Sequence, residues 1–424
     1  MSLLGTPLTL PRSGKVLPTR TLKSAMTERL ASYDQENLDK RGIPSEAYNH
    51  LYKVWGEGKI GVIVLGNIPV ERKGLEAKGN VIIDAKSPWD PVEAFKPAIA
   101  AAKAHGSLVI GQLTHGGRQV NFEVDPHPIS SSDVQCPPMM GMTFGKPRPA
   151  TVEEIDDLVK AWGFAAKTLH AAGADGAQLH SAHGYLLSQF LSARVNQRTD
   201  DYGGPLENRA RIIYRVVEEI KKQVPDPSFI LSIKINSADF AEKGLTPEES
   251  RVVCQKLAEM GVELIELSGG TYESGAFEHK KESTKKREAY FVEFAEAIKR
   301  EGLKDAVIAV TGGFRSKAAM EEALQGGACD IVGLGRPLTA EPHLIKDMLE
   351  GRTDKAKENL VDASLQTATA INQIGAIARG EPIPDLSTRE GADACLAAAL
   401  GKKPEDKPAG KGHNTKTSYE KASL

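Results

Sequence analysis

Residues 175–211 read DGAQLHSAHGYLLSQFLSARVNQRTDDYGGPLENRAR. A short apolar run, residues 176–179, is followed at once by His180, His183 and Tyr185, so three proton-bearing side chains leave the end of what is typical of a buried strand. In a barrel of alternating strands and helices, the chemistry lies at the carboxyl ends of the strands. The stretch therefore predicts a strand whose carboxyl end carries reactive groups.

Short apolar runs alternate with longer amphipathic segments along most of the chain. Several runs, such as residues 61–65 and 307–310, are apolar on both faces, as parallel strands covered by helices must be. Eight strand–helix units over about 350 residues predict an α/β fold, a single (β/α)8 TIM barrel, with a doubly wound sheet as the alternative. The eight runs are residues 21–27, 60–67, 108–113, 175–180, 229–236, 262–268, 306–311 and 330–335.

The segments between the runs carry helix signals. Thr151 and Glu154 form a capping-box sequence ahead of apolar residues that recur at spacings of three and four. Thr246 is followed by Pro247 and then by Glu249, which is a second N-terminal helix signature. The apolar positions of the first of these predicted helices are Ile155, Leu158, Val159, Trp162, Ala166 and Leu169.

Three segments depart from this alternation. The start of the chain, punctuated by proline and glycine up to residue 18, predicts a short hairpin. Residues 114–150 form a long connection after the third run, rich in Pro, Ser, Gly and Met, which is typical of a lid or binding loop. From about Gly401 large apolar residues almost vanish, which predicts disorder. We expect a barrel over residues 1–385 and a C-terminal extension over residues 386–424.

The composition indicates a protein that acts on a small ligand. The chain has 424 residues, 54 of them basic and 56 acidic, and its formal net charge of −2 argues against nucleic acid or an anionic membrane as a main partner. No stretch approaches the 18 or so apolar residues of a membrane span, and the N-terminus lacks the apolar block of a secretory signal. We expect a cytoplasmic protein, monomeric or homodimeric, whose four separated cysteines are free thiols.

The chain contains one GxGxxG pattern, formed by Gly56, Gly58 and Gly61. A dinucleotide fingerprint needs these glycines after a strand and at the start of a helix. Here a helix-like segment precedes them and an apolar run follows, so we interpret the pattern as a helix stop and a tight turn. Any nicotinamide cofactor would then bind without a Rossmann domain.

Glycines also follow the seventh and eighth runs, at Gly312 and Gly313 and at Gly335, which precedes Arg336. The loops after strands seven and eight are the usual phosphate site of this barrel. Glycine lets backbone N–H groups approach an anion, and Arg336 can offer it a forked pair of donors. We expect a phosphate site here; glycines that only turn the chain at barrel ends are the alternative.

His180 and His183 allow three interpretations. They could bind a metal, but the first run supplies no further His or Asp, so we expect no metal site. They could be structural histidines with satisfied hydrogen bonds. As donors, two imidazoles can hold a carbonyl or nitro oxygen whose negative charge grows in the transition state. Tyr185 could then supply the proton, which is the interpretation we favour.

The segments HSAHGYLLSQFLS (residues 180–192), TDDYGG (199–204) and ENR (207–209) closely resemble the fourth strand and following loop of the old yellow enzyme family, flavin-dependent ene reductases. The resemblance covers about residues 7–384. It implies a TIM barrel with FMN at its C-terminal mouth, reduced by NAD(P)H. Flavin N5 would then pass hydride to the β-carbon of an activated alkene, such as an enone, enal, maleimide or nitroalkene.

The same resemblance implies a role for each site residue. His180 and His183 would hold the substrate oxygen, and Tyr185 would protonate the α-carbon from the opposite face. Thr27 would hydrogen-bond the flavin C4 oxygen, and Gln112 would recognise the pyrimidine edge. The other residues that match the family's cofactor site are Asn67, near the flavin ring, and Gly313, Gly335 and Arg336, at the phosphate.

Lys234 is a departure from the family pattern, because relatives usually carry Arg on the fifth strand beside flavin N1 and C2=O. Lysine supplies the positive charge but not the planar fork, so the resemblance implies a somewhat different flavin potential. Three alternatives stay open. They are a biosynthetic relative that isomerises or oxidises its substrate, a flavin-binding protein without turnover, and a flavin-free lyase or aldolase that uses Lys234 as a Schiff-base amine.

Overall fold

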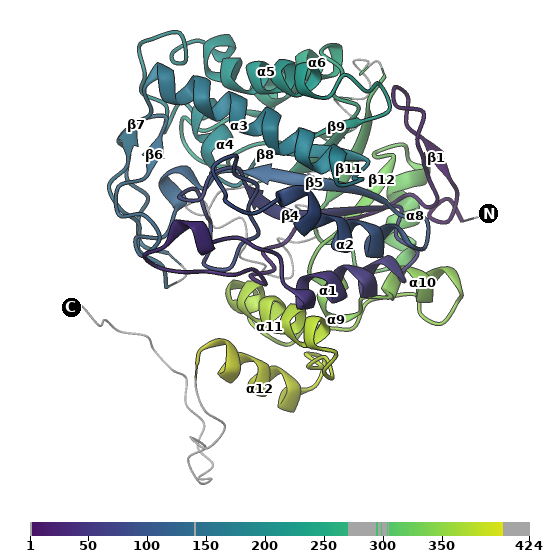
Figure 1. The fold of residues 1–424 in the computed structure, drawn as a ribbon. Helices are drawn as coiled ribbons and strands as arrows, with labels where there is room; N and C mark the ends of the chain where they lie inside the picture. Colours follow the sequence, from purple (N-terminus) through teal and green to yellow (C-terminus); the bar gives the residue numbers. More distant parts are fainter. Residues whose placement is uncertain are drawn as a thin grey trace.

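The computed structural model describes residues 2–139, 141–269, 294–295, 298, 303 and 305–401. Its centre is a closed barrel of parallel strands, which confirms the predicted (β/α)8 fold and rules out an open doubly wound sheet (Figure 1). The barrel closes where Val332 pairs with Thr21. The strands are β3 (Thr21–Lys23), β4 (Val62–Pro69), β5 (Leu108–Thr114), β8 (Gly176–Ser181), β9 (Ile230–Asn236), β10 (Leu264–Ser268), β11 (Val307–Thr311) and β12 (Ile331–Leu334).

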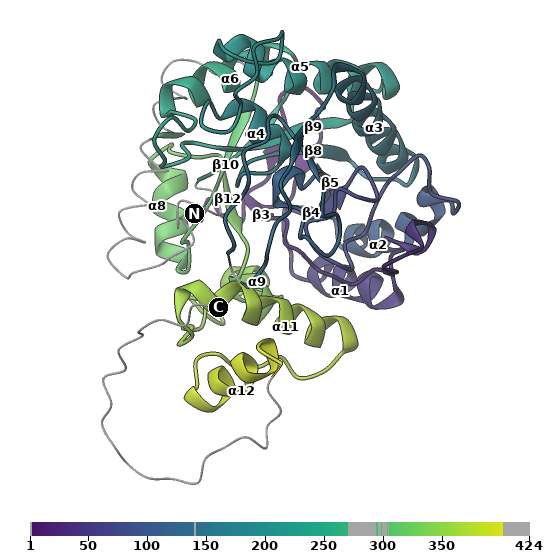
Figure 2. The same cartoon turned by 90° about the vertical axis from the view of Figure 1, so that its left-hand side faces the viewer.

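Helices surround this barrel, and a second apolar core lies between the two layers (Figures 1 and 2). The helices of the barrel units are α1 (Glu46–Gly56), α2 (Pro91–Lys103), α3 (Val152–Ala171), α4 (Leu186–Leu191), α5 (Leu206–Gln223), α6 (Pro247–Glu259), α8 (Lys317–Gln325), α9 (Pro337–Ala340) and α10 (Leu344–Leu349). Most of the connection from β10 to β11 lies outside the described residues.

The capping sequences and the glycine pattern lie at helix ends, as the sequence predicts. Thr151 and Glu154 exchange hydrogen bonds as a capping box at the start of α3, and Thr246 and Glu249 do the same at α6. Each box satisfies two backbone N–H groups that the first turn of a helix leaves without partners. Gly56 is the last residue of α1 and β4 begins soon after it, so the glycine pattern is a helix stop and turn.

The predicted N-terminal hairpin is present and closes one end of the barrel. Its strands β1 (Leu8–Thr9) and β2 (Val16–Leu17) pair antiparallel. Leu10 and Leu17 are fully buried in the cluster of side chains that fills the barrel interior. Around them, the backbone N–H of Arg12 donates to Glu263 at 3.0 Å, just before β10. The amino-terminal end of the barrel is therefore plugged.

The long connection after β5 lies at the other end of the barrel from the hairpin (Figure 1). It contains two short strands, β6 (Ile129–Ser130) and β7 (Arg148–Pro149). The hydroxyl of Ser130 donates to Gln189 Oε1 at 2.9 Å, and that of Ser131 donates to the Gln189 backbone oxygen at 3.0 Å. The connection thus packs on α4, the helix that follows Tyr185.

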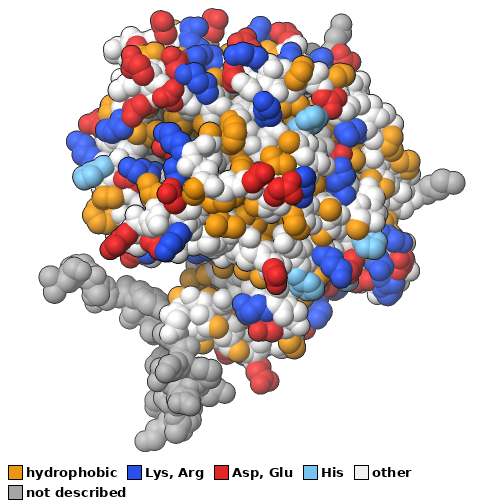
Figure 3. Space-filling view, in the orientation of Figure 1, with side chains coloured by type: hydrophobic (Ala, Val, Ile, Leu, Met, Phe, Trp, Pro, Cys, Tyr) orange, Lys and Arg blue, Asp and Glu red, His pale blue; other side chains and the backbone are white. Residues whose placement is uncertain are grey.

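Two further helices lie beyond the barrel units, α11 (Gln366–Arg379) and α12 (Arg389–Ala399). Helix α11 packs on α1, and α12 packs on the outer side of α11 (Figure 2). The tail for which the sequence predicts disorder lies, from residue 402, outside the described residues. None of the helices in the described part of the chain is long and apolar enough to cross a membrane. Acidic and basic side chains are interspersed on the face shown in Figure 3.

We expect Leu17→Ala to lower the free energy of unfolding by about 2–5 kcal/mol, because the leucine is fully buried and truncation leaves a cavity. Val16→Ala, on the neighbouring and half-exposed residue, should change it by less than about 0.5 kcal/mol. Urea unfolding of both variants measures the difference. Equal small losses would show that the hairpin does not support the barrel.

Candidate active site

The three groups after β8 are brought together by a sharp turn. β8 ends at Ser181, and His183 and Gly184 both adopt left-handed backbone conformations, with φ of 61° and 82°. Gly184 has no room for a side chain, since an added Cβ would lie 2.2 Å from Gln119 Oε1. The turn sends Tyr185 back toward the barrel as the first residue before α4.

A left-handed histidine costs roughly 1–2 kcal/mol, so other contacts must hold it. The backbone N–H of His183 donates to Asn236 Oδ1 at 3.3 Å, and its Nε2 lies 2.8 Å from Ser268 Oγ. Both partners come from the ends of neighbouring strands, β9 and β10. Residues in rare backbone conformations cluster at functional sites because the surrounding structure holds them there.

The rings of His180, His183 and Tyr185 lie against one another. The His180 centroid is 5.2 Å from that of His183 and 4.7 Å from that of Tyr185, both in edge-on geometry. His180 and Tyr185 are buried, with 4% and 6% of their surfaces exposed. His180 Nδ1 accepts the backbone N–H of Ala182 at 3.3 Å, so its hydrogen is on Nε2, which is then a donor.

Both imidazoles are neutral over the ordinary pH range. Burial lowers the pKa of His180 well below its usual 6.5, and electrostatic interactions with His183 and Lys234 lower it further. Burial and Lys234 lower the pKa of His183 to about 3, against a smaller opposite effect of Glu266. A neutral imidazole keeps one N–H donor and brings no positive charge into the site.

Gln189 holds this turn in place. Its Nε2 donates to the backbone oxygens of Gly184, at 2.7 Å, and Gly116, at 3.1 Å. Its Oε1 accepts from the backbone N–H of Arg118 and from Ser130. One buried amide therefore ties the turn after β8 to the connection after β5.

Lys234 lies at the level of His180 on the neighbouring strand, and Glu266 lies at the same level one strand further on. Lys234 Nζ is 2.9 Å from Glu266 Oε1 and 2.7 Å from Ser24 Oγ. Glu266 is fully buried and also accepts from Thr311 at 2.7 Å. Burial alone would raise the pKa of Glu266, but Lys234 and the hydroxyl donors outweigh it and hold the pKa below its usual value.

Gln112 is joined to this pair through a second glutamine. Gln112 Nε2 donates to Gln178 Oε1 at 2.7 Å, and Gln178 Nε2 donates to Glu266 Oε2 at 3.0 Å. Both amides are buried in the barrel. The structure therefore brings Gln112 and Lys234 into one hydrogen-bonded group.

Thr27 and Asn67 form a separate group beside β4. Asn67 follows Gly66 at the irregular end of β4, and Asn80 Nδ2 donates at 3.2 Å to both Asn67 Oδ1 and Thr27 Oγ1. The Thr27 hydroxyl donates its single hydrogen to Glu76 at 2.6 Å. It can donate to a flavin oxygen only by turning away from Glu76.

The predicted phosphate residues follow β11 and β12. Gly313 is left-handed, with φ of 79°. At Gly335 an added Cβ would have Met26 Sδ, 3.8 Å away, as its nearest neighbour, so the space beside it is open. Arg336 Nη1 donates to Gln366 Oε1 at 3.0 Å, which ties it to α11.

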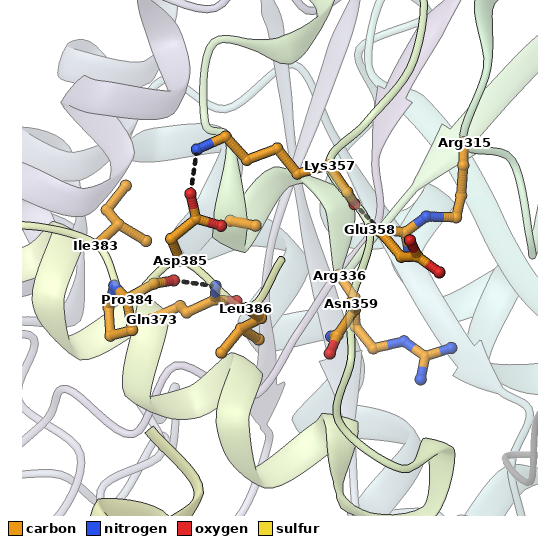
Figure 4. A pocket seen from close by; sticks show the side chains of 11 residues that line it. Arg315, Arg336, Lys357, Glu358, Asn359, Gln373, Ile383, Pro384, Asp385 and Leu386 are labelled. Atoms are coloured by element: carbon orange, nitrogen blue, oxygen red, sulfur yellow. Dashed lines mark hydrogen bonds and ion pairs between the residues drawn. The ribbon is translucent and has the colours of Figure 1, made fainter. Parts of the chain in front are cut away.

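Arg336 also lines a pocket that it shares with Arg315 and with the segments before and after α11 (Figure 4). Lys357 pairs there with Asp385 at 2.7 Å. The residues lining this pocket do not include the three aromatic groups after β8. They are Arg315, Arg336, Ala340, Lys357, Glu358, Asn359, Gln373, Ile383, Pro384, Asp385 and Leu386.

Some residues of the site had no part in the sequence prediction. Glu266 could have been found, because a carboxylate inside an apolar run is a signal in itself. Gln178 has the same signal in β8. Gln189 and Ser268 had none, because their contacts depend on how distant loops meet. No group of three or more His, Cys, Asp or Glu side chains suited to a metal occurs among the described residues.

Comparisons with known proteins agree with this geometry. The NADH:flavin oxidoreductase / NADH oxidase family matches residues 4–355. The chain is 40% identical over 406 residues to the NADH-dependent flavin oxidoreductase nadA of Aspergillus parasiticus, over 94% of this chain and 90% of that protein. It is 28% identical over 344 residues to an NADPH dehydrogenase of Bacillus subtilis, over 80% of this chain and 92% of that protein.

Solved structures show the same fold. A 2-naphthoyl-CoA reductase complex aligns with a TM-score of 0.75 at 24% identity, over 93% of this chain and 58% of that one. Morphinone reductase in complex with tetrahydroNAD aligns with a TM-score of 0.66 at 22% identity, over 84% of this chain and 92% of that one.

The barrel and the sequence relatives together define a flavin-dependent oxidoreductase. The chain belongs to the NADH:flavin oxidoreductase / NADH oxidase family, that of the old yellow enzymes, with FMN as cofactor and NAD(P)H as reductant. The mouth of this barrel suits FMN, because a lysine and an amide lie within it and open space adjoins Gly335.

The low pKa of His183 predicts a pH-dependent stability. Between about pH 6.5 and pH 3 the unfolded chain binds a proton that the native protein does not, so stability falls as the pH falls through this range. Going from about pH 7 to about pH 5 should cost the wild type about 2 kcal/mol more than His183→Gln. Urea unfolding at both pH values measures this.

His170→Gln is the matched control, because that imidazole is 42% exposed at the end of α3. Its replacement tests for any general effect of losing a histidine. An identical pH dependence in His183→Gln and the wild type would contradict a neutral His183 in the native protein.

Proposed function

We propose that this oxidoreductase is an ene reductase, which reduces the C=C bond of enones, enals, maleimides or nitroalkenes at the expense of NAD(P)H. The observation that carries the proposal is the convergence of His180, His183 and Tyr185 at the end of β8. Two neutral donors beside a phenol match a reaction in which an oxygen gains negative charge and a carbon gains a proton.

In this proposal, FMN supplies the hydride to the alkene. His180 donates from Nε2 to the substrate oxygen, since its Nδ1 already accepts the Ala182 N–H. His183 acts as the second donor from Nδ1, with its Nε2 accepting the Ser268 hydroxyl. Tyr185 gives its phenolic proton to the α-carbon. His180 and Tyr185 are buried and His183 is partly buried, which limits competing water and strengthens each hydrogen bond.

The cofactor residues proposed from the resemblance divide into three groups. Lys234 and Gln112 would contact the flavin ring from the barrel interior, and Thr27 and Asn67 from the side of β4. The phosphate would lie on Gly313, Gly335 and Arg336. The barrel boundary at residue 385, a cytoplasmic location and a monomeric or homodimeric state stay predictions.

The Schiff-base alternative is disfavoured by the contacts of Lys234. Its amino group is held by the Glu266 carboxylate and the Ser24 hydroxyl, whereas a Schiff-base lysine must attack as a free amine. Borohydride reduction in the presence of carbonyl compounds tests this. A covalent adduct on Lys234 would revive the alternative.

Tyr185→Phe should leave the reduction of FMN by NAD(P)H unchanged and slow the reduction of cyclohexenone by roughly 10²–10⁴, since it removes the general acid alone. Anaerobic stopped-flow absorbance follows the two half-reactions separately. Tyr202→Phe, on a buried tyrosine after α4, is the matched control and should affect neither. Equal losses in both half-reactions of Tyr185→Phe would refute the assignment.

Product analysis separates reduction from the isomerising or oxidising alternatives. With NADPH present, an ene reductase gives the saturated product in a one-to-one ratio to the reductant consumed. Turnover of the alkene without any reductant would favour isomerisation instead.

Replacing His180 with Ala should weaken the binding of a phenol, an analogue of the anionic oxygen, by about 10-fold to 100-fold, which corresponds to one hydrogen bond to a charged group. Titration of the flavin spectrum with p-hydroxybenzaldehyde gives the dissociation constant. Unchanged affinity would indicate a structural role for His180.

A further inference from the structure

Glu266 is a fully buried charge at the mouth of the barrel, with 0% of its surface exposed. Its Oε1 accepts from Ser24 at 2.6 Å, from Thr311 at 2.7 Å and from Lys234 at 2.9 Å. Its Oε2 accepts from Gln178 at 3.0 Å. A carboxylate offers about four acceptor positions, two on each oxygen. Three of these partners share Oε1, and Gln178 is on Oε2.

This carboxylate sets the direction of two amides. Because an ionised carboxylate only accepts hydrogen bonds, Gln178 must turn its NH2 group toward Glu266. The Gln178 carbonyl is then left to Gln112, which must in turn present its own NH2 group to Gln178. One charge therefore decides which way the Gln112 amide faces, two residues away along the chain of hydrogen bonds.

The same carboxylate controls the charge beside the proposed flavin position. Lys234 and Glu266 together carry no net charge, and the distance between them, 2.9 Å, is that of a direct ion pair. Both side chains are buried, with 5% and 0% exposed, so solvent screens the pair little. Without the carboxylate, Lys234 would have no buried counter-charge in the protein, and the negative charge of reduced FMN would take that place.

We propose that Glu266 is a positioning residue that sets the reduction potential of bound FMN, by offsetting and orienting Lys234 and by fixing the direction of the Gln112 amide. The proposal rests on the flavin site proposed above for Lys234 and Gln112. It deepens that site by adding a residue that does not itself contact the flavin.

The test is the midpoint potential of the FMN holoenzyme carrying Glu266→Gln, measured by dye-equilibrated reduction without any alkene. Gln keeps the shape of the side chain and removes its negative charge. The equilibrium between oxidised and reduced FMN should then shift at least tenfold toward reduced FMN, which is a rise in midpoint potential of about 30 mV for a two-electron couple. An unchanged or lower potential overturns the proposal.

Glu263→Gln is the matched control. Glu263 precedes the same strand and is also buried, with 1% exposed, but it binds the hairpin at the opposite end of the barrel. Its replacement should leave the potential at the wild-type value. A rise equal to that of Glu266→Gln would show that the effect is not local and would overturn the proposal.

Repeating the measurement in a protein that also carries Lys234→Met shows whether Glu266 acts through Lys234. In Lys234→Met the buried carboxylate loses its cation and should take up a proton, so exchanging it for Gln then changes no charge. The potential shift caused by Glu266→Gln should therefore largely disappear in Lys234→Met. A shift of undiminished size there overturns the proposal.

The outcomes also separate this inference from the proposed function. If Lys234→Met leaves both the midpoint potential and the dissociation constant for FMN at their wild-type values, the flavin placement itself is wrong, and the inference fails with it. If Lys234→Met changes either value and Glu266→Gln does not raise the potential, only the inference fails. Failure of alkene reduction affects neither measurement.

Glu266→Asp serves if Glu266→Gln does not yield folded holoenzyme. It keeps the charge but shortens the side chain, so at least one of the four hydrogen bonds must break. The shortened carboxylate should then offset the charge of Lys234 less well, so the midpoint potential should rise, by less than is expected for Glu266→Gln. A wild-type or lower potential would overturn the proposal.

Discussion

The ion pair between Lys234 and Glu266 is the interaction on which the mouth of this barrel depends. Removing one partner of a buried pair costs about 3–5 kcal/mol, because the other charge is left without compensation. The protein meets this constraint by surrounding Glu266 with donors from three further places in the fold. The polar groups of β5, β8, β9, β10 and β11 are thus held as one unit before any ligand binds.

The barrel interior changes character along its axis. Near the hairpin it is filled with aliphatic side chains such as Leu17, Leu22 and Leu264. Further along the same strands come Gln112 and the buried ion pair, and beyond them the histidine turn. Alternation along each strand repeats every two residues, so a strand of five to seven residues has room for an apolar and a polar layer.

The sequence allowed the strands and helix starts to be predicted because these depend on neighbours in the chain. Thr151 and Glu154 are three residues apart and cap α3 as expected. The contacts of Glu266 with Ser24 span 242 residues, and no local pattern encodes which side chains meet across a barrel. For the same reason the sequence did not predict the hydrogen bond from Arg336 to α11 or the hydrogen bonds by which Gln189 joins two loops. The roles of the site residues rest on the family resemblance and stay open to experiment.

The plugged end of the barrel has a consequence for how such an enzyme can change over evolutionary time. The hairpin stabilises the amino-terminal ends of the strands through Leu10, Leu17 and Glu263, none of which touches the groups at the mouth. Loop substitutions at the mouth can then alter which molecules are accepted while the anchoring half keeps the fold intact. The contribution of the hairpin to stability and the loops that would decide selectivity lie at opposite ends of the same eight strands, so a lineage can diversify its chemistry without first acquiring a more robust scaffold.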